Sequence, residues 1–112
     1  MPPTDLEISP ADAARALQDG AQVIDVREPY EREAGHIPGS RHIELTQLAA
    51  QAATLDRAAP IVTVCRVGSR SYLAAQALRG AGFDAASMAG GMVRWAGEGR
   101  PLEPAGGHVA DH

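Results

Sequence analysis

The sequence predicts an α/β domain with three layers, α/β/α, in which helices cover both faces of a parallel β-sheet. Short apolar runs typical of buried strands alternate with helical patterns along the chain, which is the order found in parallel sheets. The 112 residues, 45% of them hydrophobic, suffice for one domain with its own core. The 12 glycines and 8 prolines indicate that short, sharply turned connections join the elements.

The first three elements lie before residue 30. Residues 6–8 alternate briefly between apolar and polar, which predicts a short strand. Ser9 is a typical N-cap and Pro10 suits a first helical position, so we expect a helix that runs to about Gln18. Residues 23–26 form an apolar run between turn-forming residues, which is typical of a strand covered on both faces.

The middle of the chain adds two helical segments and a short strand. Residues 30–34 can form one or two helical turns, and the turn-rich residues 35–40 lead into a short strand at residues 41–43. Leucine and alanine then recur at helical spacing across residues 45–55, which predicts an amphipathic helix.

The last third contains the most strand-like run of the chain, residues 61–64. A helix with one apolar face follows it and begins near Ser69 or Ser71. Residues 83–88 predict a weaker last strand, and residues 92–95 predict a short helix.

The domain organisation is simple, because no internal repeat is visible. We expect residues 1–102 to form a single domain and residues 103–112 to form a frayed C-terminal tail.

Charge and cysteine content exclude several classes of function. Ten Lys and Arg against 14 Asp and Glu give a net charge of −4, and no basic run occurs, so we expect no nucleic-acid partner. No stretch approaches the roughly 20 apolar residues of a membrane span, so we expect no membrane partner. A single cysteine cannot form a disulfide within the chain, and the first residues lack a signal-peptide pattern, which favours a reducing, cytoplasmic location.

The single cysteine follows the strand at residues 61–64 and opens a cationic loop. Helix N-termini and nearby cations favour the thiolate form of a cysteine, and ligands bind at the carboxyl ends of parallel strands. We therefore predict that Cys65 is a catalytic nucleophile at the floor of a small-anion site. The backbone amides and side chains of the loop would bind the anion, and they belong to Arg66, Val67, Gly68, Ser69 and Arg70.

An inert cysteine, buried at the end of a strand, is the alternative interpretation, since most lone cysteines are structural. A purely structural turn does not require Arg66 and Arg70 on either side of Gly68. This pattern favours the functional interpretation.

Four motifs together resemble the single-domain rhodanese, or sulfurtransferase, family. They are Ile-Asp-Val-Arg-Glu at residues 24–28, Gly-His-Ile-Pro-Gly-Ser at 35–40, Cys-Arg-Val-Gly-Ser-Arg-Ser at 65–71 and Gly-Gly-Met-Val-Arg-Trp at 90–95. They occur in the order that the family has. The resemblance implies a five-stranded parallel sheet in the order 1-5-4-2-3 and a catalytic cysteine in a six-residue loop, here residues 65–70.

The resemblance also implies a reaction. Cys65 would take a sulfane sulfur from thiosulfate or a persulfide donor, become a persulfide, and pass the sulfur to cyanide or a thiol. The loop amides and arginines would bind the anionic donor and stabilise the departing sulfite. No cofactor is expected. The partners would be a small anionic sulfur donor and a thiol, cyanide or sulfur-acceptor protein.

Residues outside the loop receive lesser roles. Asp25 and Arg27 end the second strand, and we interpret them as supporting residues that tie loops together. His36 stands in a turn, where contacts to neighbouring backbone groups are commoner than metal ligation, so we predict no metal. Arg32 and Arg41 replace the aromatic and the apolar residue that the family commonly has there.

Three other functions stay open at this point. A cysteine-dependent phosphatase has a similar loop, but its arginine comes after five intervening residues, whereas Arg70 follows Cys65 after four. A non-catalytic rhodanese module is disfavoured, because such modules often lack the cysteine. A sulfur relay to a partner protein is compatible with the same loop.

Overall fold

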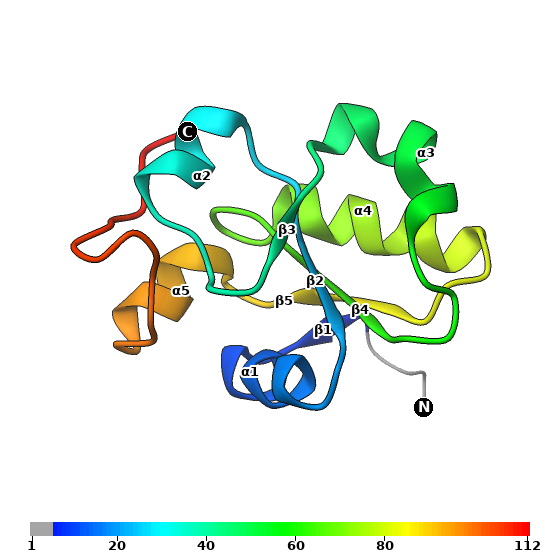
Figure 1. Ribbon diagram of the computed structural model, residues 1–112, viewed down its shortest axis with the longest axis horizontal. Coiled ribbons are helices and arrows are strands. Elements are labelled where there is room, and N and C mark those ends of the chain that lie inside the picture. The colour runs from blue at the N-terminus through cyan, green and yellow to red at the C-terminus, as the bar shows by residue number, and fades with distance from the viewer. Residues whose placement is uncertain (1–5) are drawn as a thin grey trace.

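The computed structural model describes residues 6–112 and shows a five-stranded sheet between layers of helices (Figure 1). All neighbouring strands are parallel, and their order is β1-β5-β4-β2-β3. The strands are Glu7–Ile8 (β1), Gln22–Asp25 (β2), Arg41–His42 (β3), Ile61–Val64 (β4) and Ala85–Met88 (β5). The predicted fold class and the strand order implied by the resemblance are both confirmed.

In the described part of the chain, five α-helices connect and cover the strands. They are Pro10–Gln18 (α1), Pro29–Ala34 (α2), Leu48–Gln51 (α3), Ser69–Gly80 (α4) and Gly91–Gly97 (α5). α1 begins as predicted, because the Ser9 hydroxyl accepts a hydrogen bond from the Asp12 amide at 3.1 Å. Within residues 6–112, no helix combines the length and the apolar character needed to cross a membrane.

The single helix predicted across residues 45–55 is broken into three pieces. A 3₁₀ helix, Leu45–Gln47 (η1), precedes α3, and a second one, Ala52–Thr54 (η2), follows it. The apolar face persists, since Leu55 is buried, but none of the pieces has a side-chain cap. The Leu45 amide instead donates to the Val26 carbonyl oxygen at 3.1 Å, next to the end of β2. The prediction was wrong because this tie and the absence of caps prevail over the apolar period.

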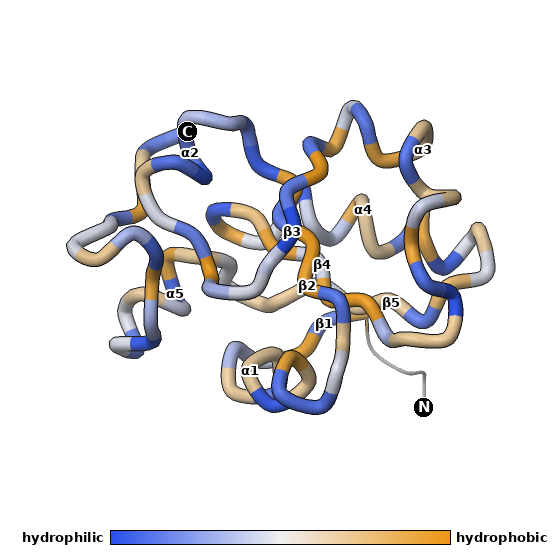
Figure 2. Tube along the Cα trace, viewed as in Figure 1, coloured by the Kyte–Doolittle hydropathy of each residue, from blue (hydrophilic) through white to orange (hydrophobic). Residues whose placement is uncertain are grey.

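Successive side chains on the central strands belong alternately to two hydrophobic clusters, one on each face of the sheet. On β2, Val23 packs in the same cluster as Ala13 of α1 and Trp95 of α5. Its neighbour Ile24 belongs to the other cluster, together with Leu78 of α4. Figure 2 shows hydrophobic residues along these strands. The central strands are therefore covered on both faces, as in other parallel sheets.

Residues 103–112, predicted to fray, fold back onto the domain. His36 and Glu103 form an antiparallel bridge through two backbone hydrogen bonds of 2.9 and 2.8 Å. The His108 amide donates to the Ala34 carbonyl oxygen at 2.9 Å. Val109 packs against the hydrophobic cluster that contains Trp95 of α5. Most of these contacts are made by the backbone, which explains why no apolar period in the sequence indicated them.

Helix α5 fixes the segment that follows β4. The Met92 amide donates to the Cys65 carbonyl oxygen at 2.8 Å, and the Val93 amide donates to that of Arg66 at 3.0 Å. Gly91, the first residue of α5, has a φ of +58°, and a Cβ there would collide with the same two carbonyl groups. Only glycine permits this close approach of two backbones.

Gly91→Ala should lower the free energy of unfolding by roughly 1–3 kcal/mol, because the added methyl group must displace α5 or the loop. Gly97→Ala is the matched control in the same helix, since a Cβ there meets nothing within 4 Å. The control should be neutral or stabilising by up to about 1 kcal/mol. Urea unfolding measures both effects, and equal stability of the two variants would show that α5 does not hold the loop.

Candidate active site

The cysteine loop lies at the carboxyl edge of the sheet, where β4 leads into α4. Cys65 is buried, and its Sγ accepts a hydrogen bond from the Gly68 amide at 3.1 Å. Gly68 has a φ of +107°, in the left-handed region that favours glycine. Because Gly68 is also the N-cap of α4, the turn places the sulfur at the N-terminus of that helix.

Peptide geometry turns two loop amides away from α5. Within one planar trans peptide unit, the C=O and the N–H point in opposite directions. Since the carbonyl oxygens of Cys65 and Arg66 are bonded to α5, the N–H groups of Arg66 and Val67 point to the other side. Gly68 has no side chain that could cap the first N–H groups of α4, which leaves them for an anion. The loop therefore combines a sulfur with several backbone donors.

Three buried hydroxyl groups brace this turn, and the contacts that they make were not predicted. Ser71 Oγ donates to the Gly68 carbonyl oxygen at 3.2 Å and lies 2.7 Å from Ser87 Oγ. Thr63 Oγ1 donates to the Ser71 carbonyl oxygen at 2.7 Å. The one signal in the sequence is a polar residue within an apolar run, Thr63 in β4, and it gives no indication of the partner.

Arg70 is bound to a buried glutamate of α2. Its two terminal nitrogens donate to the two carboxylate oxygens of Glu31 at 2.7 and 2.8 Å, and Glu31 is fully buried. The Glu28 amide donates to the same carboxylate at 3.0 Å. Burial raises the pKa of Glu31, but the hydrogen bonds from Arg70 and the Glu28 amide outweigh it and hold this pKa below its usual value. The hydrogen bonds to Glu31 raise the pKa of Arg70 in turn.

This ion pair changes the role expected of the Arg70 side chain. With both terminal nitrogens on Glu31, the guanidinium anchors the end of the loop to α2. Glu31 was not among the predicted site residues. Its position three residues after Glu28 matches a capping box at the start of α2, which is a local signal but does not reveal the contact with Arg70.

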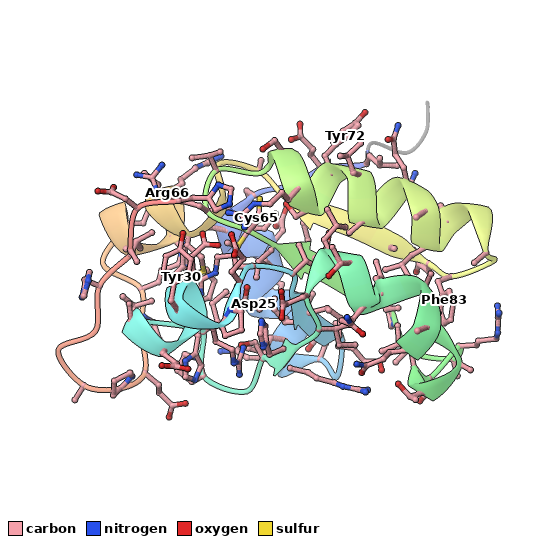
Figure 3. The ribbon with its side chains drawn as sticks, turned by 90° about the horizontal axis from the view of Figure 1, so that it is seen from above. Asp25, Tyr30, Cys65, Arg66, Tyr72 and Phe83 are labelled. Carbon is pink, nitrogen blue, oxygen red and sulfur yellow. The ribbon has the colours of Figure 1, made fainter. Side chains whose placement is uncertain are left out.

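Arg66 is the loop arginine that keeps a solvent-accessible guanidinium. Its side chain is 32% exposed, and its Nη2 lies 3.2 Å from Asp111 Oδ1. Its Nε is buried and has no hydrogen-bond partner in the part of the chain that the structure describes. Figure 3 shows Arg66 and Cys65 near the returning C-terminal segment. Arg66 can therefore offer charge and donors to an anion at the loop.

Asp25 and Arg27 form a buried pair at the end of β2. Arg27 Nε and Nη2 donate to the two Asp25 carboxylate oxygens at 2.9 and 2.8 Å, and Nη2 also donates to the Gly35 carbonyl oxygen at 2.8 Å. His42 Nε2 lies 2.7 Å from the Arg27 carbonyl oxygen. Arg32, which departs from the family pattern, lies 3.5 Å from Asp25. These contacts join β2, β3 and the end of α2, which fits the supporting role predicted for Asp25 and Arg27.

The backbone of His36 pairs with that of Glu103, while its ring contacts a nearby backbone group. Its Nδ1 lies 3.0 Å from the Arg32 carbonyl oxygen. Among the described residues, possible metal ligands gather at Glu28, Glu31 and His112, whose ligand atoms lie within 4.8 Å of one another. Both Glu31 oxygens already accept hydrogen bonds from Arg70, so a cation there would be repelled by the neighbouring guanidinium. The absence of a metal stays a prediction.

A cavity of ≈ 240 Å³ lies beside the loop, between the end of β2, η1 and the start of α4. Its lining residues are Val26, Glu28, Glu44, Leu45, Thr46, Arg70 and His112. The cavity opens at the same edge of the sheet as Cys65.

Comparisons with known sequences match most of the chain. A family model described as the rhodanese-like domain matches residues 9–98. The thiosulfate sulfurtransferase GlpE of Pseudomonas aeruginosa (strain LESB58) is 41% identical over 96 residues, which cover 85% of this chain and 87% of that protein.

Solved structures give the same result. A rhodanese-related protein from Thermoplasma volcanium is 31% identical, with a TM-score of 0.81 over 86% of this chain and 95% of that chain. The reduced CoADR-RHD protein of Bacillus anthracis is 30% identical, with a TM-score of 0.78 over 83% of this chain, but the match covers only 16% of that protein. With a matching family model, a matching relative and the same sheet, this chain belongs to the rhodanese-like domain family.

Proposed function

We propose that the chain is a sulfurtransferase of the thiosulfate sulfurtransferase type, with Cys65 as its nucleophile. The observation that carries this proposal is the position of Cys65 Sγ. This sulfur lies at the N-terminus of α4 and accepts a hydrogen bond from the Gly68 amide. Relatives at 40 and 41% identity are named thiosulfate sulfurtransferases, which supports it. A reducing compartment such as the cytoplasm, where a lone cysteine stays a thiol, belongs to the same proposal.

In the first step the Cys65 thiolate attacks the outer sulfur of thiosulfate. A new S–S bond forms at Sγ, the S–S bond of the donor breaks, and sulfite leaves with the electron pair of that bond. Arg66 and the backbone amides of residues 66–70 bind the anionic donor and stabilise the charge on the leaving group. A persulfide donor reacts in the same way and releases a thiolate.

In the second step cyanide or a thiolate attacks the outer sulfur of the Cys65 persulfide. A C–S or S–S bond forms, and the electron pair of the persulfide bond returns to Cys65, which becomes a thiolate again. The ≈ 240 Å³ cavity beside the loop has room for a small acceptor. An acceptor protein would present its own thiol to the same persulfide. Asp25, Arg27 and Glu31 hold the surrounding segments in place.

The loop geometry disfavours phosphate-ester hydrolysis. Arg70 follows Cys65 after four residues, and its terminal nitrogens are held by Glu31 instead of lying free above the sulfur. A phosphatase needs such a guanidinium on the phosphate oxygens. Turnover of an aryl phosphate that depends on Cys65 would overturn the assignment.

Cys65→Ser should abolish the covalent step, because a serine hydroxyl is close in size to the thiol but does not accept a sulfane sulfur. After incubation with thiosulfate, intact-mass analysis should show that the wild-type chain gains one sulfur atom and loses it on addition of cyanide. The variant should show no gain, while its urea unfolding confirms a folded chain. A Cys65→Ser protein that still transfers sulfur would refute covalent catalysis at this residue.

The two loop arginines should respond differently to substitution by alanine. Arg66→Ala should lower kcat/KM for thiosulfate by roughly 10- to 1000-fold, as expected for the loss of one anion-stabilising donor, and change stability by no more than about 0.5 kcal/mol. Arg70→Ala leaves the buried Glu31 carboxylate without its partner and should lower the free energy of unfolding by roughly 3–5 kcal/mol.

Steady-state kinetics and urea unfolding of both variants separate the two roles. Equal free energies of unfolding for Arg66→Ala and Arg70→Ala would show that Arg70 does not anchor the loop. Unchanged kinetics in Arg66→Ala would show that the backbone amides bind the donor alone.

A further inference from the structure

The segment of residues 107–112 is tethered to the domain before it reaches the cysteine loop. Gly107 lies so close to the Ala34 carbonyl oxygen that a Cβ would sit 2.9 Å from it. The His108 amide donates to the same oxygen at 2.9 Å, and Val109 packs against the hydrophobic cluster that contains Trp95 of α5. Three consecutive residues thus fix where the next ones lie.

Beyond this tether, two side chains contact two segments that border the site. Asp111 Oδ1 lies 3.2 Å from Arg66 Nη2 on the loop. His112 Nε2 lies 3.1 Å from Glu28 Oε2, at the start of α2, and His112 also lines the cavity beside the loop. Figure 3 shows the segment running toward Arg66. The chain therefore places a carboxylate of its own on the loop arginine that is free of Glu31.

We propose that Asp111 is a specificity-determining residue that competes with small anionic sulfur donors for Arg66, an inference that rests on the proposed function. A carboxylate and a thiosulfate dianion cannot both accept the same Nη2 hydrogen bond, and their like charges repel each other at such distances. Arg66 has further N–H donors, but an anionic donor binds it less tightly while Asp111 is in contact, because the two negative charges repel each other. A neutral reagent reaches Cys65 without this competition.

The exposure of Asp111 makes it a displaceable competitor. Its side chain is 98% exposed, so the carboxylate keeps its hydration while it contacts Arg66. Exposed ion pairs of this kind are weak, and a ligand can replace one partner. The tether through residues 107–109 nevertheless keeps the carboxylate near Arg66, which raises its effective concentration there. Such a residue weakens donor binding and leaves the chemical step at Cys65 unchanged.

Asp111→Asn tests the proposal, because it removes the charge and keeps the size of the side chain. Asp84→Asn is the matched control, since Asp84 is exposed and immediately precedes β5, at the amino edge of the sheet and opposite the loop. Both substitutions change the net charge from −4 to −3.

The first measurement is independent of sulfur transfer and compares alkylation of Cys65 by anionic iodoacetate and neutral iodoacetamide in the full chain. Asp111→Asn should raise the ratio of the iodoacetate rate to the iodoacetamide rate by about two- to fivefold, the range expected for an exposed ion pair. Asp84→Asn should leave this ratio unchanged. In about 1 M salt, where the screening length falls to about 3 Å, the effect of Asp111→Asn should disappear.

The second measurement is the steady-state turnover of thiosulfate. Asp111→Asn should lower KM by about two- to fivefold with kcat unchanged. An unchanged alkylation ratio and KM would overturn the proposal, as would a raised KM, which would mean that Asp111 orients Arg66 for the donor. If no variant turns thiosulfate over while the alkylation ratio still shifts, the proposed function fails and the exclusion of anions by Asp111 stands.

Discussion

The hydrogen bonds from α5 to the cysteine loop are the constraint on which the site depends. They commit the carbonyl oxygens of Cys65 and Arg66 to one side, so the following N–H groups face the other side. Two glycines make this arrangement possible, Gly68 through its left-handed turn and Gly91 through the close approach of the backbones. The anion site that we propose is therefore built largely from the backbone of the loop, to which Arg66 adds a charge.

Two buried ion pairs hold the neighbouring segments around that loop. Burial of a charge is costly unless the charge is paired and hydrogen-bonded. Glu31 meets this condition with Arg70, and Asp25 meets it with Arg27, in both cases with a further backbone hydrogen bond. Replacing such pairs by apolar residues is often neutral for stability, so their value here lies in geometry. They set where α2 and the end of β2 lie relative to Cys65.

The sequence predicts those features that depend on apolar period and on glycine. The buried strands and the cysteine loop follow from patterns within a few residues, and the parallel arrangement follows from the alternation of strands and helices along the chain. The partner of Arg70 was missed because Glu31 is one acidic residue on a short helix, and the contact spans 39 positions. The contact of Asp111 with Arg66 spans 45 positions. Polar contacts over such separations leave no period in the sequence. The segment at residues 45–55 has the apolar period of a helix, yet it breaks into three short pieces that lack side-chain caps.

The different partners of the two loop arginines also bear on the class of reaction. A buried cysteine at a helix N-terminus suits attack on phosphorus as well as on sulfur, so Cys65 alone does not decide between them. Transfer of a phosphoryl group is promoted by a guanidinium over its oxygens, and Glu31 holds the terminal nitrogens of Arg70 away from that task. Backbone amides and Arg66 remain, and in the proposed reaction these groups stabilise the departing sulfite while the bonds change at sulfur. The position of Glu31 in α2 thus favours sulfur transfer over phosphate hydrolysis, although it is 34 residues from the cysteine in the chain.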